Sequence, residues 1–357
     1  MNALARAVAL AERARGNTFP NPLVGAAIVR DGEIVGQGFH AYAGSVHAEV
    51  AALRNCADAR GTTLYVTLEP CAREGRQPPC TAAIIAAGVR RVVVGALDPN
   101  PVTGGAGIAQ LRAAGIDVEV RADAACERLI EDFTVWITSD RPYVGLKMAS
   151  SLDGFVVPAP GETLRLTGDA WFDALQQVRF GYQAVMVGAG TVLIDDPVLT
   201  VRGGSRCVPF TRIIIAGRRP LLPTLRVFQE VPGYSRAIVV AADESMPWVT
   251  AIRKVADVVV SPGLSGHVDL RGALTILRRD HAIHSLLCEG GPLLASGLFE
   301  AKVIDRIYWV IAPRFLSSAT SVPVLAKSPT IAGRVVFDRL EKIGEDVLLS
   351  GKMHTDV

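Results

Sequence analysis

One histidine, two cysteines and one glutamate are spaced in a way that suits metal-assisted hydrolysis. His47 and Glu49 stand two residues apart, and Cys71 and Cys80 each follow a proline. Zn²⁺ binds imidazole nitrogen and thiolate sulfur in tetrahedral geometry, and three protein ligands leave the fourth position open for water. We therefore predict that His47, Cys71 and Cys80 bind one Zn²⁺ per chain and that Glu49 transfers the proton.

The order of these residues points to attack of water on an amino-substituted ring. H-x-E followed by Pro-Cys and a second Cys is the arrangement of zinc deaminases. The gap between Cys71 and Cys80 holds eight residues, whereas the commonest form of the motif holds two. A non-catalytic, zinc-stabilised scaffold is the alternative, although a purely structural site is expected to have a fourth protein ligand.

Length, charge and hydropathy exclude several classes of protein. The 357 residues suffice for two domains, and half of them are apolar. Residues 1–142 contain 14 Arg, no Lys and 15 Asp or Glu, so they lack the basic footprint that nucleic-acid binding requires. No apolar run is long enough to span a membrane, and residues 1–16 predict an amphipathic helix rather than a signal peptide. We expect a cytoplasmic protein with a small-molecule substrate, and no nucleic-acid or membrane partner.

The remaining cysteines give no sign of a disulfide framework. Cys56, Cys126, Cys207 and Cys288 are dispersed along a long chain and have mostly apolar neighbours. We expect all four to be buried as small hydrophobic residues.

The predicted elements of the first half place the four chemical residues at element ends. A hairpin turn at Asp31-Gly32 joins strands over 26–30 and 33–38. A helix over 48–54 puts His47 and Glu49 at its N-terminus, a strand over 64–69 leads to Cys71, and a helix over 81–88 follows Cys80. A strand over 91–96, a helix over 108–114, a strand over 116–120 and a helix over 123–132 complete an α/β layered domain.

Five motifs in this half carry a family resemblance. PNPLVG, HAEV, TLEPC, GRQPPC and DPNP occur in this order between Pro20 and Pro101. Together they resemble the deaminase half of the bifunctional deaminase/reductase family of riboflavin biosynthesis. The resemblance implies a cytidine-deaminase-like α/β/α domain that deaminates a phosphoribosylamino-pyrimidinone. It also implies substrate contacts at Asn21, His40, Arg76, Asp98 and Asn100.

The second half is similar to the reductase half of the same family. The polar segment 139–142 ends in proline, so we predict domains over 1–141 and 142–357. K-x-A-x-S-L-D-G then begins at Lys147, as in that family's dihydrofolate-reductase-like α/β domain. The resemblance implies reduction of the ribosyl group to ribityl, with NADPH contacts at Ala149, Arg165, Thr191, Asp195, Gly290 and Gly291. It implies substrate contacts at Thr163, Arg179, Leu199, Arg202 and Glu289.

Two glycine-rich turns are consistent with a bound dinucleotide. Gly188-Ala189-Gly190 and Gly290-Gly291 each follow a buried apolar run, and glycine turns let the backbone approach phosphate. They do not match the Rossmann fingerprint, which suits a different NADPH-binding fold. Arg165 or Arg218 is a candidate for binding the 2′-phosphate.

Several departures from the family pattern leave a second functional hypothesis open. Arg73 stands where the family has histidine, Phe155 replaces a basic residue, and Arg165 replaces an aromatic one. The family's A-G-[RK]-G is Gly104-Gly105-Ala106-Gly107 here. The leading hypothesis is a bifunctional zinc deaminase and NADPH reductase, which by resemblance is a homo-oligomer. The alternative is a paralogue with a shifted substrate or an inactive reductase.

Overall fold

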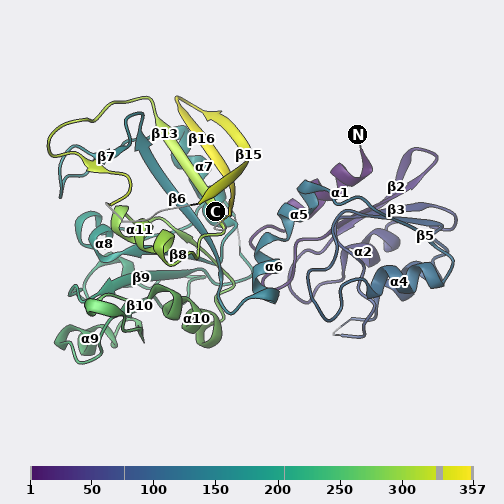
Figure 1. Ribbon diagram of the computed structural model, residues 1–357. Coiled ribbons are helices and arrows are strands. Elements are labelled where there is room, and N and C mark those ends of the chain that lie inside the picture. Colours follow the sequence, from purple (N-terminus) through teal and green to yellow (C-terminus); the bar gives the residue numbers. More distant parts are fainter. Residues whose placement is uncertain (1, 76, 205, 327–332, 355–357) are drawn as a thin grey trace. The chain divides into compact units, whose positions relative to one another are not determined.

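The chain forms two compact units, Met1–Ser139 and Asp140–Val357, which we call unit 1 and unit 2 (Figure 1). The computed structural model describes residues 2–75, 77–204, 206–326 and 333–354. The division between the units falls two residues before the predicted boundary. The assignment of one activity to each domain stays a prediction.

Unit 1 is built on one sheet. Within residues 2–75 and 77–139 the sheet has five strands in the order β2-β1-β3-β4-β5. Strands β3, β4 and β5 are parallel, and β1 runs antiparallel to both of its neighbours. The elements are α1 (Ala3–Glu12), β1 (Gly25–Arg30), β2 (Glu33–Phe39), α2 (Ala48–Arg54), β3 (Thr63–Val66), α3 (Cys80–Ala86), β4 (Arg91–Val94), α4 (Ala106–Ala113), β5 (Asp117–Val120), α5 (Ala124–Leu129) and α6 (Glu131–Thr138).

Helices cover both faces of this sheet (Figure 1). On one face, α1 and α5 contribute Leu4 and Leu129 to an apolar cluster. On the other face, α2, α3 and α4 contribute Ala52, Ile84 and Leu111 to a second cluster. The two apolar layers confirm the predicted α/β/α architecture of this half.

The end of unit 1 differs from the prediction of a single helix over 123–132. The Oδ1 of Asp123 accepts hydrogen bonds from the Ala125 and Cys126 amides and so begins α5. Ile130 then leaves the helical conformation, with φ −114° and ψ 13°, while its side chain is buried. This inward turn ends α5, and α6 begins at the next residue.

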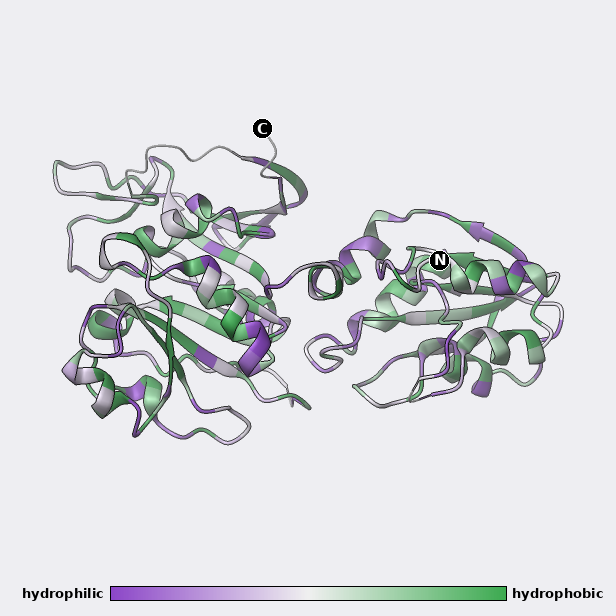
Figure 2. Cartoon of the chain, turned by 60° about the horizontal axis from the view of Figure 1, so that its bottom comes forward, coloured by the Kyte–Doolittle hydropathy of each residue, from purple (hydrophilic) through white to green (hydrophobic). Residues whose placement is uncertain are grey.

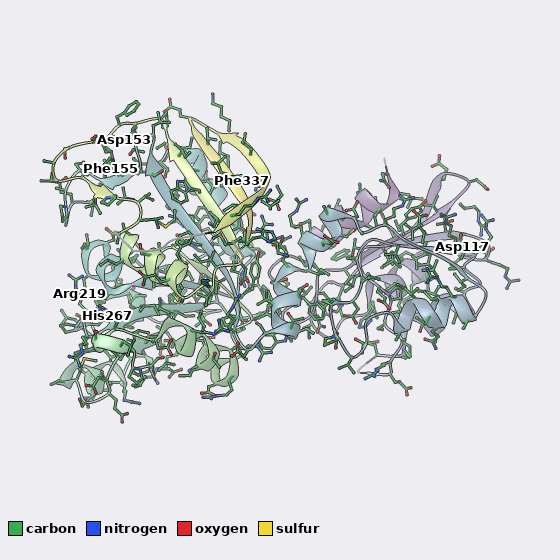
Figure 3. All side chains as sticks on the ribbon, viewed as in Figure 1. Asp117, Asp153, Phe155, Arg219, His267 and Phe337 are labelled. Atoms are coloured by element: carbon green, nitrogen blue, oxygen red, sulfur yellow. The ribbon has the colours of Figure 1, made fainter. Side chains whose placement is uncertain are left out.

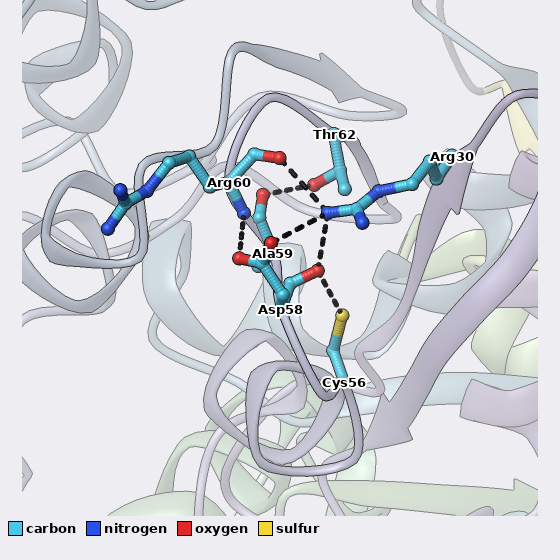
Figure 4. A network of polar contacts seen from close by, with 6 residues as sticks. All are labelled: Arg30, Cys56, Asp58, Ala59, Arg60 and Thr62. Carbon is cyan, nitrogen blue, oxygen red and sulfur yellow. Dashed lines mark hydrogen bonds and ion pairs between the residues drawn. The ribbon is translucent and has the colours of Figure 1, made fainter.

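A polar network holds the end of β1 against the loop between α2 and β3 (Figure 4). The Arg30 Nη2 donates to the carbonyl oxygens of Asp58 and Arg60 at 2.8 and 3.1 Å. The Cys56 Sγ donates to the same Asp58 carbonyl at 3.2 Å. Cys126 and Cys288 are buried as predicted, but Cys56 is half-buried in this turn and Cys207 is exposed in a loop. The prediction was therefore wrong for Cys56 and Cys207.

Unit 2 contains a larger, mostly parallel sheet. Its described residues form nine strands in the order β11-β10-β9-β8-β12-β6-β13-β16-β15, in which β16 and β15 are antiparallel. The strands are β6 (Tyr143–Ser151), β8 (Ala184–Gly188), β9 (Thr211–Gly217), β10 (Ile238–Ala241), β11 (Asp257–Val260), β12 (Ser285–Cys288), β13 (Arg306–Ala312), β15 (Arg334–Ile343) and β16 (Asp346–His354). Strands β7 (Phe155–Val157) and β14 (Val322–Pro323) pair separately.

Helices also bury both faces of this sheet. Helices α10 (Leu270–His281) and α11 (Pro292–Glu300) pack on one face, against residues such as Met186. Helices α8 (Ala189–Asp195) and α9 (Pro247–Ile252) pack on the other, against residues such as Val185. Burial on both faces explains the uninterrupted apolar runs of these strands, which carry mostly hydrophobic colouring in Figure 2. The remaining elements are α7 (Asp169–Phe180) and two short 3₁₀ helices (Arg226–Phe228 and Leu264–Gly266).

Both units are mixed α/β structures, as predicted. None of the described helices combines the length and the apolar character needed to cross a membrane.

Candidate functional sites in the two units

Three different segments of unit 1 bring His47, Cys71 and Cys80 together. His47 is the residue before α2, Cys71 lies in the loop after β3, and Cys80 is the first residue of α3. The His47 Nδ1 lies 3.1 Å from the Cys80 Sγ and 3.5 Å from the Cys71 Sγ. The three potential ligand atoms all lie within 4.8 Å of one another.

This geometry fits a tetrahedral zinc ion. Zn–N and Zn–S bonds of usual length separate two ligand atoms by about 3.6 Å in a tetrahedral site. A hydrogen bond with Cys80 lowers the pKa of the Cys71 thiol, and the same bond raises the pKa of Cys80. The two sulfurs thus share one proton, which a bound divalent cation would displace. The donor set and the spacing both suit zinc with three protein ligands.

The long loop between the two cysteines is tied at its base. The Cys80 amide approaches the Cys71 Sγ at 3.4 Å, and the Thr81 amide donates to the Cys71 carbonyl at 3.2 Å. These contacts bring the two ends of the loop together, so its eight residues do not separate the sulfurs. The unusual gap is therefore compatible with one metal site.

Glu49 lies in the first turn of α2, beside this cluster. Its side chain is buried, with 4% of the residue exposed. Burial raises the pKa of Glu49 to about 7, and the Cys71 thiolate adds to this rise. A carboxyl group with a pKa near neutrality can both accept and release a proton.

A cavity of about 230 Å³ opens beside His47. Asn21 and His40, both predicted to contact substrate, line this cavity together with Ser45 and Gln77. The Asn21 Nδ2 lies 3.1 Å from the His40 Nε2, and the His40 Nδ1 lies 3.2 Å from the Val46 carbonyl oxygen. Burial lowers the pKa of His40, so its neutral form, with the proton on Nδ1, satisfies both contacts.

Asp98 and Asn100, also predicted to contact substrate, are not among the residues that line this cavity. The Asp98 side chain accepts hydrogen bonds from the Asn100 amide and the Thr103 hydroxyl, and Asn100 accepts one from the Val102 amide. Both side chains therefore stabilise the conformation of the loop that contains them. The Arg73 Nη2 lies 3.5 Å from the Val102 carbonyl of the same loop. Arg76 lies outside the described residues.

Glu69 is a residue of this site that the sequence analysis did not single out. Its carboxylate accepts hydrogen bonds from the amides of Gly105 and Gly107 at 3.0 and 2.9 Å. The amides of Asp98 and Ile108 are also within 3.3 Å. Glu69 thereby fixes the loop before α4 to the segment that carries Cys71. The sequence did offer a signal for this role, because Glu69 is an acidic residue at the end of an apolar strand, two positions before the predicted metal ligand Cys71.

In unit 2 several of the predicted cofactor and substrate residues lie just after the ends of parallel strands. Connections leave β8 and β12 in opposite directions along the sheet, because β9 lies beyond β8 and β13 lies beyond β6. Such a switch point is the usual ligand crevice of an open α/β sheet. Gly188 ends β8 and Glu289-Gly290-Gly291 follows β12. Thr191 and Asp195 lie on α8, which starts directly after Gly188.

The register of the sheet places further predicted residues at this point. Cys288, the last residue of β12, pairs with Leu146 of β6, so Glu289 to Gly291 leave the sheet just beyond this pair. A side chain at Gly291 would meet no atom within 4 Å, whereas one at Gly290 would collide with Leu294. Gly291 therefore borders open space, and Gly290 is needed for the packing of α11. The glycine turns and the switch point both fit an extended dinucleotide.

Arg179 and Glu289 form a buried, two-pronged ion pair. The Arg179 Nε and Nη2 lie 2.7 and 2.9 Å from the two carboxylate oxygens of Glu289. The Arg179 Nη1 donates to the Thr200 carbonyl at 2.6 Å. Only 10% and 8% of the two side chains are exposed. The pair also positions the segment of Leu199, which adopts a left-handed φ of 56°.

The remaining predicted residues of unit 2 are Arg165, Arg202 and Thr163. Arg165 and Arg202 each lie 5.6 Å from the ring centroid of Phe172, and Arg165 also pairs with Asp169. Arg165, predicted to bind the cofactor, thus lies with a predicted substrate residue. Thr163 is exposed in the loop before α7.

The departure at Phe155 lies next to a structural turn (Figure 3). Asp153, two residues earlier, accepts hydrogen bonds from the Leu316 and Ser317 amides at 3.1 and 2.8 Å. Asp153 also accepts from the Ser151 hydroxyl. These bonds join the β6–β7 turn to the loop after β13, so Asp153 has a structural role here.

The metal site leads to a direct prediction about zinc content. We expect the purified protein to hold about one zinc per chain, as a single three-ligand site requires. Cys80→Ser should reduce this content strongly, because a hydroxyl is a much poorer zinc ligand than a thiolate. Elemental analysis of both proteins measures the effect. Cys207→Ser, which removes an exposed cysteine outside the cluster, is the matched control and should retain its zinc.

Comparison with known proteins finds relatives of both halves of the chain. Residues 1–96 match the cytidine and deoxycytidylate deaminase zinc-binding region, and residues 142–349 match the RibD C-terminal domain. The riboflavin biosynthesis protein RibD of Aquifex aeolicus is 37% identical over 99% of this chain and 98% of its own length. RibD of Escherichia coli (strain K12) is 38% identical over 97% of each chain.

Solved structures show the same similarity over the whole chain. Acinetobacter baumannii RibD, form 1, superimposes with a TM-score of 0.83 at 32% identity and covers 99% of this chain and 98% of that one. A Thermotoga maritima diaminohydroxyphosphoribosylaminopyrimidine deaminase/5-amino-6-(5-phosphoribosylamino)uracil reductase gives a TM-score of 0.83 at 32% identity. It covers 98% of this chain and 97% of that one.

Proposed function

Because the chain belongs to the RibD family of bifunctional deaminase/reductases of riboflavin biosynthesis, we propose that each unit carries one of the two reactions. Unit 1 hydrolytically deaminates 2,5-diamino-6-(5-phosphoribosylamino)pyrimidin-4(3H)-one. Unit 2 reduces the ribosyl group of the product to ribityl with NADPH. The observation that carries the proposal is the His47–Cys71–Cys80 cluster beside the buried Glu49.

In the deamination, Glu49 moves the proton. His47, Cys71 and Cys80 would hold the zinc ion, which would act as a Lewis acid and make a water molecule nucleophilic near neutral pH. The Glu49 carboxylate accepts a proton as water adds to the ring carbon, and then gives it to the departing amino nitrogen, which leaves as ammonia. Asn21 and His40 line the cavity beside this group and orient the pyrimidine by hydrogen bonds.

In the reduction, the residues of unit 2 hold the two reactants at the switch point of the sheet. The nicotinamide of NADPH supplies hydride, which is the cofactor's own chemistry. The carboxylate of Glu289, fixed by Arg179, accepts a hydrogen bond from the pyrimidine. Arg202 is exposed beside Phe172, where its guanidinium suits the substrate phosphate.

The substrate class and the setting of the enzyme follow from the same proposal. The substrate is a phosphorylated pyrimidine small molecule. We retain the predictions that the enzyme is a cytoplasmic homo-oligomer and binds no nucleic acid.

The reductase reaction can be tested independently of the first reaction. When the deaminated intermediate is supplied directly, we expect NADPH absorbance to fall by one equivalent per substrate molecule. The reaction should proceed unchanged in zinc-depleted protein, since the metal belongs to unit 1. Absence of NADPH oxidation above background would favour the paralogue with an inactive reductase, the reading motivated by Phe155 and Arg165.

A further inference from the structure

The segment 199–202 of unit 2, which begins and ends with a predicted substrate residue, has an unusual main-chain conformation. Leu199 adopts a left-handed φ of 56°, and Asp196, three residues earlier, has a φ of 39°. Such conformations are costly for residues other than glycine and persist only where the surrounding contacts impose them. The Leu199 side chain is buried in an apolar cluster, so this residue offers a ligand mainly its main-chain groups. The shape of the segment therefore depends on what holds its main chain.

Two side chains from other parts of unit 2 bind this main chain. The Val201 amide donates to the Tyr234 hydroxyl oxygen at 2.7 Å. The Arg202 amide donates to the Gln176 Oε1 at 3.1 Å, and only 5% of Gln176 is exposed. The two amides belong to successive peptide groups, so the two bonds fix the orientation of both. They thereby fix the direction in which the Arg202 side chain leaves the main chain.

The two side chains are themselves held in place. Gln176 lies on α7, three positions before Arg179, which also bonds to the segment. Residues three apart share one face of a helix, so α7 presents both side chains to the segment. The Tyr234 ring packs edge-on against the buried ring of Phe210, with centroids 5.5 Å apart and an interplanar angle of 75°. Phe210 and Tyr234 also pair as an isolated β-bridge.

This arrangement orients an exposed arginine before any ligand arrives. The Arg202 guanidinium carbon lies 5.6 Å from the ring centroid of Phe172, while its main chain is fixed from the other side by Gln176. A side chain that is already oriented loses less conformational freedom when it binds. A guanidinium group held in this way is suited to a phosphate, which it binds through two parallel hydrogen bonds.

Resting on the proposed reductase function, we infer that Gln176 and Tyr234 are positioning residues for the substrate of unit 2. They hold segment 199–202 so that Arg202 is oriented for the substrate phosphate before the substrate binds. Both act through the segment, because their oxygen atoms accept hydrogen bonds from its main-chain amides. Without either bond, the strained φ of Leu199 is imposed less strongly and other conformations of the segment become populated. The apparent affinity for substrate then falls with the fraction of molecules in the binding conformation.

The test removes each oxygen atom separately and follows NADPH oxidation with the deaminated intermediate supplied directly. Tyr234→Phe keeps the ring and removes the hydroxyl, and Gln176→Met keeps the length of the side chain and removes the acceptor. We expect each variant to raise the KM for the intermediate about 5- to 100-fold, because an amide without its acceptor disfavours the binding conformation. The kcat and the KM for NADPH should stay close to their wild-type values, the pattern expected when only substrate binding is weakened.

Tyr182→Phe is the matched control. It removes another hydroxyl of unit 2, which lies 3.2 Å from the Tyr308 hydroxyl, and should change neither KM. Thermal unfolding of all three variants identifies those that are folded.

The possible outcomes separate this inference from the function on which it rests. An unchanged KM for the intermediate in a folded Tyr234→Phe or Gln176→Met protein would overturn the role of that residue and leave the reductase function standing. An equal rise in the KM for NADPH, or a fall in kcat alone, would overturn the inference in favour of a general structural role. Absence of NADPH oxidation by the wild-type protein would overturn the reductase function together with the inference.

Discussion

Glu49→Gln is expected to slow ammonia release from the diaminopyrimidine about 10²- to 10⁴-fold, the usual contribution of a general acid–base group. Glutamine keeps the shape of the side chain but can no longer accept and return the proton. Because Glu49 is buried with a raised pKa, its neutral replacement leaves no unpaired charge. The variant should therefore fold normally and hold as much zinc as the wild type. Ammonia release, zinc content and thermal unfolding are the three measurements.

Glu33→Gln provides the matched control for this experiment. Glu33 is exposed at the start of β2, so its substitution removes the same charge from unit 1 without touching the metal cluster. Its ammonia release should equal that of the wild type. An undiminished rate in Glu49→Gln protein with full zinc content would show that another group transfers the proton.

Arg179→Met is expected to destabilise unit 2 by about 3–5 kcal/mol, because it leaves the Glu289 carboxylate buried without its partner. The reduction should be lost as well, since Glu289 is then no longer held in place. Calorimetry should show a lower unfolding temperature for one transition. Removal of zinc, which belongs to unit 1, identifies the other transition.

A similar ion pair at the surface supplies the control. Arg165 pairs with Asp169, but 62% and 88% of their side chains are exposed. Arg165→Met should therefore change stability by at most about 1 kcal/mol. Replacing both buried partners, as in Arg179→Met with Glu289→Leu, should restore part of the stability but not the reduction. Equal effects of the two single arginine variants would contradict a buried structural role for Arg179.

Much of this arrangement could be predicted from the sequence. The helix that carries His47 and Glu49, the hairpin before it and the uninterrupted apolar strands follow from local patterns that tertiary packing did not override. The metal cluster could be predicted as well, because histidine and cysteine residues at this motif spacing have few roles other than metal binding. Cys56, shown in Figure 4, and Cys207 mark the limit of prediction, because burial of a small residue in a loop depends on contacts that no local pattern encodes.

The sequence could not predict which residues far apart in the chain form pairs with each other. Arg179 and Glu289 are separated by 110 positions, and nothing near either residue shows that they pair with each other. For such residues the resemblance indicated proximity to a ligand but not the contacts that each side chain makes.

The hydrogen bonds from the loop before α4 to the Glu69 carboxylate determine which positions of that loop can change in sequence. This carboxylate holds the loop before α4 through main-chain amides, so the hold does not depend on the identity of most side chains there. The glycines are the exception: a Cβ at Gly107 would lie 1.9 Å from the Pro70 carbonyl oxygen, one at Gly104 would lie 2.6 Å from the Asp98 carbonyl oxygen, and Gly105 has a left-handed φ of 82°. Random mutagenesis of positions 102–107 should therefore recover active enzymes with varied residues at 102 and 106, but glycine at 104, 105 and 107.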